Sequence, residues 1–219
     1  MEEKIFQMNY MADKGLSFIG HEMLEKKKPA VLLHACCGPC ATSCVERLAE
    51  DYTVTVYFYN PNITDVEEYA MRKDSLLSFI RDFNAENKGL YNIGFIEGEY
   101  NPKLFLEKTE SLQEEPEGGR RCDVCFAMRL ANTAKKAKEL HMDYFTTSLS
   151  VSPHKNYAKI KTQCLMLEEQ VGIEFLDIDF KKKNGFARSI ELSKHYGLYR
   201  QNFCGCEYAR YHGKDKADK

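Results

Sequence analysis

The chain is organised around Val31-Leu32-Leu33-His34-Ala35-Cys36-Cys37-Gly38-Pro39-Cys40-Ala41-Thr42-Ser43-Cys44. Its first three residues are apolar and lie between upstream lysines and a turn of small residues, which predicts a short buried strand. Gly38-Pro39 ends this strand, and proline suits the first turn of a helix because its missing N–H would have no partner there. The segment therefore predicts a strand, a tight turn and a helix, with three cysteines at the turn. Free N–H groups at a helix N-terminus favour the thiolate form.

Strand and helix patterns alternate along the rest of the chain. Further strands are predicted at 54–59, 91–96, 144–147 and 173–178, and helices at 41–50, 65–84, 101–112, 122–140, 152–171 and 186–195. This alternation predicts an α/β fold, with a mostly parallel sheet covered by helices on both faces. We expect residues 1–28 to form a helical N-terminal extension. Residues 29–219 are expected to form a single α/β catalytic domain with a cysteine-bearing C-terminal segment.

Composition indicates a soluble protein of a reducing compartment. Hydrophobic residues make up 43% of the 219 residues, and no run approaches the roughly 18 apolar residues of a membrane helix. The first residues, Met1-Glu2-Glu3-Lys4, do not resemble a signal peptide. We therefore expect a cytoplasmic protein without a membrane partner. In that compartment, nine cysteines favour metal binding or catalysis over a disulfide framework.

Charge is distributed unevenly along the chain. Residues 1–119 hold 12 basic and 21 acidic side chains, whereas residues 120–219 hold 19 basic and 12 acidic ones. A basic second half is what a nucleic-acid partner requires, although a merely solvated face would have the same composition.

Seven of the nine cysteines fall into three groups: Cys36/Cys37/Cys40, Cys122/Cys125 and Cys204/Cys206. Iron–sulfur clusters and structural zinc both take four thiolates. Two adjacent cysteines fit poorly on one tetrahedral zinc ion and are less strained on separate irons, which favours a cluster. The spacing Cys204-Gly205-Cys206 permits a strained, easily reduced disulfide, but two cysteines at a turn with no joint role stay possible.

Other chemical groups have a functional and a structural interpretation. His34 ends the first predicted strand and either orients a ligand or is a satisfied core histidine. His154 follows Ser152-Pro153 and either serves as a proton donor or phosphate ligand or is an ordinary turn residue. Cys164 lies in an apolar helical pattern and is predicted to be a buried core residue.

Four motifs stand out along the chain: Leu33-His34-Ala35-Cys36-Cys37-Gly38-Pro39-Cys40, Arg121-Cys122-Asp123-Val124-Cys125, Ser150-Val151-Ser152-Pro153-His154-Lys155 and Tyr199-Arg200-Gln201-Asn202-Phe203-Cys204-Gly205-Cys206. Together they resemble the QueH family of epoxyqueuosine reductases. The similarity runs in order from about residue 30 to 210. It implies reduction of epoxyqueuosine to queuosine at the wobble position of tRNA, the last step of queuosine biosynthesis.

The resemblance also implies a cofactor and a set of site residues. Cys36, Cys37, Cys122 and Cys125 match the family's ligands to a [4Fe–4S] cluster, and Cys204 and Cys206 match its redox-active pair. Cys40 is a candidate ligand for a second adjacent metal ion. Asp123 and His154 are candidate proton donors. The partners implied are tRNA carrying epoxyqueuosine and an electron donor that the sequence does not identify.

The family's fold resembles the PP-loop ATP-pyrophosphatases, a HUP or Rossmann-like architecture. Those enzymes carry a Ser-Gly-Gly-x-Asp-Ser phosphate loop after the first strand, where this chain has Cys36-Cys37-Gly38-Pro39-Cys40. ATP use is therefore not expected. Two alternatives stay open: a tRNA sulfur-transfer enzyme of the PP-loop type, which needs the missing loop, and a zinc-stapled RNA-binding module, which leaves Cys204 and Cys206 unexplained.

Overall fold

Strands and helices alternate through residues 28–209, the part of the chain that the computed structural model describes. The strands are β1 (Ala30–His34), β2 (Thr53–Phe58), β3 (Gly94–Glu97), β4 (Tyr144–Thr147) and β5 (Glu174–Phe175). The α-helices are α2 (Gly38–Ala49), α3 (Val66–Glu86), α4 (Pro102–Thr109), α5 (Arg120–Glu139), α6 (Tyr157–Val171) and α7 (Gly185–His195). Two short 3₁₀ helices, η1 (Glu110–Leu112) and η2 (Ser148–Val151), follow α4 and β4.

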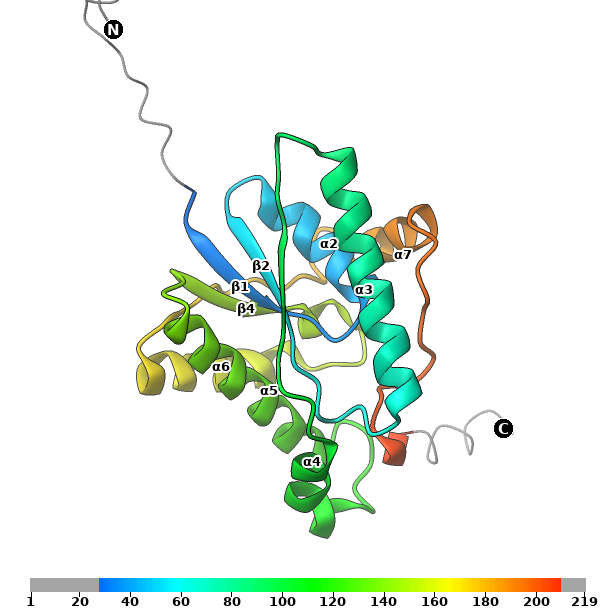
Figure 1. The fold of residues 1–219 in the computed structure, drawn as a ribbon. Helices are drawn as coiled ribbons and strands as arrows, with labels where there is room; N and C mark the ends of the chain where they lie inside the picture. The colour runs from blue at the N-terminus through cyan, green and yellow to red at the C-terminus, as the bar shows by residue number, and fades with distance from the viewer. Residues whose placement is uncertain (1–27, 210–219) are drawn as a thin grey trace, which may run out of the picture.

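The five strands form one parallel sheet in the order β3-β2-β1-β4-β5. Figure 1 shows its three central strands, β2, β1 and β4, side by side. β1 lies at the centre, so that Leu32 pairs with Thr55 of β2 on one side and Phe145 of β4 on the other. The predicted α/β class and parallel sheet are confirmed, and the arrangement is Rossmann-like. The likeness to PP-loop ATP-pyrophosphatases stays a prediction.

Helices cover both faces of the sheet, because successive side chains of the central strands point to opposite faces. Val31 and Leu33 are fully buried in the core beneath α2 and α3. Leu32, between them, is fully buried in the second core, beneath α5 and α6. Figure 1 shows α2, α3 and α7 on one side of the sheet and α5 and α6 on the other. Cys164 is fully buried in the second core, as predicted.

Several predicted element boundaries are wrong. The strand expected from residue 91 begins at Gly94. The helix expected from Ser152-Pro153 begins at Tyr157, because residues 152–155 form a separate turn and the Asn156 side chain accepts the capping hydrogen bond from the Lys159 N–H. The strand expected at 173–178 ends at Phe175. The hydrogen bonding between β5 and β4 does not continue to Ile178, because the Ile178 N–H donates to the Leu176 carbonyl of its own segment at 2.9 Å.

The predicted helical extension over residues 1–28 lies outside the described residues, except for Lys28. That residues 29–219 form a single domain likewise stays a prediction. Within residues 28–209, no helix combines the length and the apolar character needed to cross a membrane.

Candidate functional site

The first group of cysteines lies at the carboxyl end of the central strand, where parallel sheets place their sites. Cys36 and Cys37 follow β1 after Ala35, and Cys40 lies in the first turn of α2. Their three sulfur atoms all lie within 4.8 Å of one another. The turn is packed tightly on α3, because a Cβ atom at Gly38 would lie 2.7 Å from the Ser75 Oγ. The predicted position of this group is confirmed, and its geometry could hold a metal ion.

Ionisation is unequal within the group. Hydrogen bonding from the thiols of Cys37 and Cys40 holds the pKa of Cys36 well below its usual range, and the nearby charges of Lys155 and Arg129 act in the same direction. The hydrogen bond between the Cys36 and Cys37 sulfurs, in turn, raises the pKa of Cys37 to about 12. The group therefore releases its first proton easily, and further thiolates form only when a bound cation compensates their charge.

The second and third groups meet around a small cavity of about 20 Å³, called here the inner cavity. Its lining includes Cys122 and Cys125 from the first turns of α5 and Cys204 and Cys206 from the C-terminal segment. Burial raises the pKa of Cys125 to about 12 and that of Cys206 to about 11. Both therefore stay protonated thiols at neutral pH unless a cation or metal is bound.

A larger cavity of about 430 Å³, the outer cavity, lies beside the first group. Cys36, Cys40 and Gln201 line it. Cys204 and Lys155 line both cavities, as do Glu117 and His154. All three cysteine groups, separated by up to about 170 positions in the sequence, therefore converge on two adjoining cavities.

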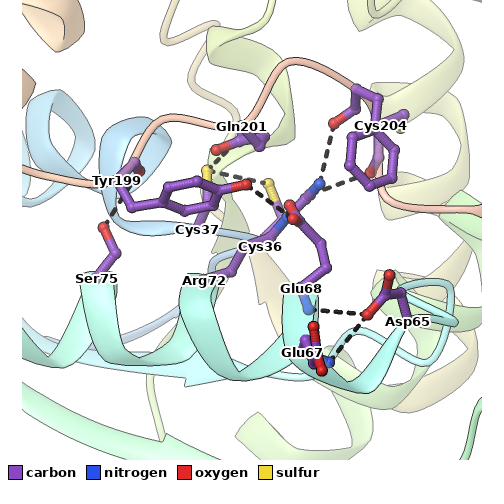
Figure 2. A network of polar contacts seen from close by, with 11 residues as sticks. Cys36, Cys37, Asp65, Glu67, Glu68, Arg72, Ser75, Tyr199, Gln201 and Cys204 are labelled. Carbon is purple, nitrogen blue, oxygen red and sulfur yellow. Dashed lines mark hydrogen bonds and ion pairs between the residues drawn. The ribbon is translucent and has the colours of Figure 1, made fainter. Parts of the chain in front are cut away.

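A buried ion pair on α3 holds the C-terminal segment in place (Figure 2). Arg72 donates from Nε to Glu68 at 2.6 Å, and both side chains are at most 2% exposed. The other two nitrogens of Arg72 donate to the carbonyls of Phe203 at 3.0 Å and Cys204 at 3.2 Å. The Tyr199 hydroxyl donates to the second oxygen of Glu68 at 2.8 Å. We call this pair the α3 clamp.

Gly205 is required where the segment passes over the clamp. Its φ of +107° lies in a region that L side chains rarely adopt. A Cβ atom there would also lie 3.0 Å from the Arg72 Nη1 and 3.0 Å from the Ile63 side chain. Four residues before Gly205, the Gln201 side chain donates to the Cys37 sulfur at 3.0 Å, which joins the segment that carries the third group of cysteines to the first group (Figure 2).

Breaking the α3 clamp should destabilise the protein strongly. We expect Arg72→Ala to lower the free energy of unfolding by about 3–5 kcal/mol, because it leaves the Glu68 carboxylate buried without its partner. Lys136→Ala is the matched control: it breaks an exposed pair with Glu139 on α5 and should cost about 0–1 kcal/mol. Denaturant unfolding under reducing conditions measures both. A cost for Arg72→Ala no larger than that of the control would contradict the clamp.

The structure decides between the two interpretations of His34. His34 is fully buried, with Nε2 3.2 Å from the Tyr59 carbonyl and Nδ1 3.0 Å from the Thr147 hydroxyl. A carbonyl only accepts, so Nε2 carries the proton and Nδ1 accepts from Thr147. Burial lowers the His34 pKa to about 3, so this is a neutral, satisfied core histidine. His154, in contrast, lines both cavities.

Asp123, the other candidate proton donor, lies away from the cavities. Both of its carboxylate oxygens accept hydrogen bonds from Lys159 at 2.9 Å, and it lines neither the inner nor the outer cavity. The structure therefore places His154, and not Asp123, where a bound molecule could be reached.

Sequence reasoning missed the polar residues around the cysteines. Glu68 and Arg72 stand four positions apart on a predicted helix, which is the spacing of an ion pair and could have signalled the clamp. Arg129 follows Cys125 by one helical turn and is only 1% exposed. In the sequence, the role of Arg129 was indicated only by the position of a charged residue on the apolar face of a predicted helix.

The donors at this site suit a metal or cluster. Thiolates are the ligands of zinc and of iron–sulfur clusters. Backbone support is present as well, since the Gly118 N–H donates to the Cys122 sulfur at 3.2 Å. Three residues that line the inner cavity each have a buried side-chain atom with no hydrogen-bond partner among the described residues: Asn62 Oδ1, Arg121 Nε and Arg129 Nη2. Such atoms are expected where a bound group is to be contacted. Most of the free volume lies in the outer cavity.

A parallel α/β sheet that gathers three groups of thiols at its carboxyl edge defines a cysteine-rich, Rossmann-like protein equipped to bind metal. Comparison with known proteins narrows this class. The family model described as "Epoxyqueuosine reductase QueH" matches residues 31–212. The chain belongs to the QueH family.

Individual relatives agree with the family model. An epoxyqueuosine reductase QueH of Streptococcus pyogenes is 42% identical over 185 residues, which cover 84% of this chain and 72% of the relative. The protein of the same name from Staphylococcus epidermidis is 41% identical, with 84% and 77% covered. That of Thermotoga maritima is 29% identical, with 85% and 93% covered. The predicted family is confirmed.

Proposed function

We propose that this protein reduces epoxyqueuosine to queuosine at the wobble position of tRNA, the last step of queuosine biosynthesis. The observation that carries the proposal is the convergence of three cysteine groups on adjoining cavities in a chain of the QueH family. The relatives to which it is similar bear the name epoxyqueuosine reductase. In this proposal the protein acts in the cytoplasm, as an oxidoreductase.

The reaction balances with the groups at the site. Both carbon–oxygen bonds of the epoxide break, a carbon–carbon double bond forms, and the oxygen leaves as water after taking up two electrons and two protons. Cys204 and Cys206 as a dithiol carry the same two electrons and two protons and would become a disulfide. An external electron donor must then reduce that disulfide before the next turnover.

Cys36, Cys37, Cys122 and Cys125 would hold a [4Fe–4S] cluster, which supplies single electrons when bound. The chain's own N–H groups support this set, because Gln201 donates to the Cys37 sulfur and the Gly118 N–H to that of Cys122. Cys40, within 4.8 Å of the Cys36 and Cys37 sulfurs, is the proposed ligand to a second metal ion.

The modified base would enter the outer cavity, whose volume of about 430 Å³ is in the range of small-molecule sites. Two of its lining residues form a cation–π pair, since the Arg200 guanidinium carbon lies 5.7 Å from the centre of the Phe186 ring. Aromatic and guanidinium planes stack on the unpaired bases of RNA loops. His154 lines the same cavity and is the proposed proton donor to the leaving oxygen.

A zinc-stapled RNA-binding module is the second candidate, because three sulfurs within 4.8 Å also suit a single ion. Anaerobic purification followed by iron, zinc and acid-labile sulfide analysis separates the two. We expect about four irons and four sulfides per chain, and conversion of epoxyqueuosine in tRNA when a chemical reductant is added. Stoichiometric zinc without labile sulfide, and no conversion, would favour the second candidate.

Binding to tRNA should depend steeply on salt through the lysines after β5. Lys182 and Lys183 are exposed, whereas Lys181 is partly buried and donates to the Lys155 carbonyl. Each phosphate contact adds about 0.7–0.9 to the slope of log affinity against log salt. We expect Lys182→Gln with Lys183→Gln to reduce that slope by about 1–2 in filter-binding titrations.

The matched control is Lys88→Gln, an exposed lysine beyond the C-terminal end of α3. A helix that follows a parallel strand returns toward the amino edge of the sheet, so Lys88 lies away from the cysteines. This control should leave the slope unchanged. If the double variant also leaves it unchanged, the RNA surface lies elsewhere.

A further inference from the structure

Arg129 is a buried cation whose hydrogen bonding is incomplete. It lies on α5, is only 1% exposed, and donates from Nε to the Cys125 carbonyl at 3.3 Å. Its Nη2 is buried and has no hydrogen-bond partner among the described residues. A guanidinium is always charged and carries five N–H donors. Burying this charge without an anionic partner therefore costs free energy of folding. Its position calls for an anion that completes the contact.

The surroundings of Arg129 show where that anion belongs. Arg129 lines the inner cavity, whose lining includes the four cysteine thiols of the second and third groups. Within the described residues, no carboxylate forms an ion pair with it, and Glu117, which also lines the cavity, is exposed. Lys155 and Arg121 bring two further positive charges to the lining of the same cavity. The groups left to balance these cations are the thiolates and whatever they bind.

We propose that Arg129 is a positioning residue that places a fixed positive charge beside the cysteine-bound cluster and thereby raises its reduction potential. The inference rests on the proposed function, because it requires the cluster. Reduction adds one electron from the external donor and breaks no bond in the protein. A permanent positive charge in a low-dielectric interior stabilises the more negative, reduced state. The Phe126 ring, 5.7 Å from the guanidinium, helps keep that interior apolar.

Redox titration of the purified holoprotein tests the charge directly. Arg129→Gln and Arg129→Met remove it, whereas Arg129→Lys keeps it. After iron and sulfide are quantified, the reduced fraction is measured by visible and electron paramagnetic resonance spectra at fixed ambient potentials. We expect the neutral variants to lower the ratio of reduced to oxidised cluster at least about tenfold, which is about 59 mV for one electron. Arg129→Lys should stay within about threefold of wild type.

Arg188→Gln is the control for charge alone. Arg188 is an exposed arginine paired with Glu46 and Glu191, and it lines neither the inner nor the outer cavity, so its loss should leave the potential unchanged. Neutral variants that keep the cluster at the wild-type potential would overturn the inference. If the neutral variants lose the cluster, Arg129→Lys decides: a retained cluster at the wild-type potential supports a role of charge, and a lost cluster or a lowered potential refutes it. Wild-type protein without iron and sulfide would instead refute the proposed function.

Discussion

Cys36→Ala should yield a folded protein without the proposed [4Fe–4S] cluster, colourless and with iron and sulfide close to zero instead of about four each per chain. Cys36 is 5% exposed, and its sulfur lies within 4.8 Å of those of Cys37 and Cys40. Loss of one ligand opens a cluster to solvent and to loss of iron, so activity on tRNA should disappear as well. Metal analysis and the visible spectrum of anaerobically prepared protein measure the effect. The same result is expected for Cys37→Ala, Cys122→Ala and Cys125→Ala.

Two other cysteines provide buried controls. Cys44 and Cys164 are both fully buried, and neither belongs to the three cysteine groups. Cys44→Ala and Cys164→Ala should keep full iron and colour. If Cys40→Ala bleaches the protein while Cys122→Ala or Cys125→Ala does not, the first group with Cys40 is the true ligand set, and the four proposed ligands are wrong.

Cys204→Ala and Cys206→Ala should have the opposite signature: a full complement of iron, and no repeated turnover. In the proposed chemistry this pair carries the two electrons and two protons of each cycle, so the enzyme cannot be reloaded without either thiol. Gly205 permits the close turn that joins them, and the α3 clamp fixes the segment beside the outer cavity. Iron content and the conversion of epoxyqueuosine in tRNA at substrate excess are the two measurements.

Each result for these variants has a distinct meaning. Loss of iron would show that Cys204 or Cys206 is a ligand, in agreement with their place around the inner cavity with Cys122 and Cys125. Full iron with full steady-state activity would show that the pair has no part in the reaction. Serine in place of either cysteine serves as the matched variant, since it keeps nearly the same shape but cannot form a disulfide.

Patterns that act over short distances in sequence predicted most of the fold. Three apolar residues before Gly38-Pro39 were enough to place β1 and the start of α2, because a buried strand and a first-turn proline are local requirements. The sequence rule for parallel sheets then placed the cysteines at the carboxyl edge. β5 was predicted too long, since the hydrogen bond that ends it joins residues that look equally suited to a strand.

The polar surroundings of the site could not be predicted in the same way. Arg72 selects carbonyls more than 130 positions away, and Gln201 selects a sulfur 164 positions away. The inner cavity combines residues from α5 with the C-terminal segment, and this pairing depends on the packing of the whole sheet. The sequence identified the reactive atoms but not the groups that position them.

The order of the cysteines along the chain has a consequence for how the protein is made in the cell. Synthesis on the ribosome proceeds from Cys36 to Cys206, so the first group of thiols emerges long before the partners that enclose it exist. Gln201 and the segment held by the α3 clamp can cover that group only after α7 and the residues that follow it have been synthesised. Nascent chains are therefore open to capture of stray zinc or to wrong disulfides. We expect maturation with the cofactor to take place after translation, on the folded protein.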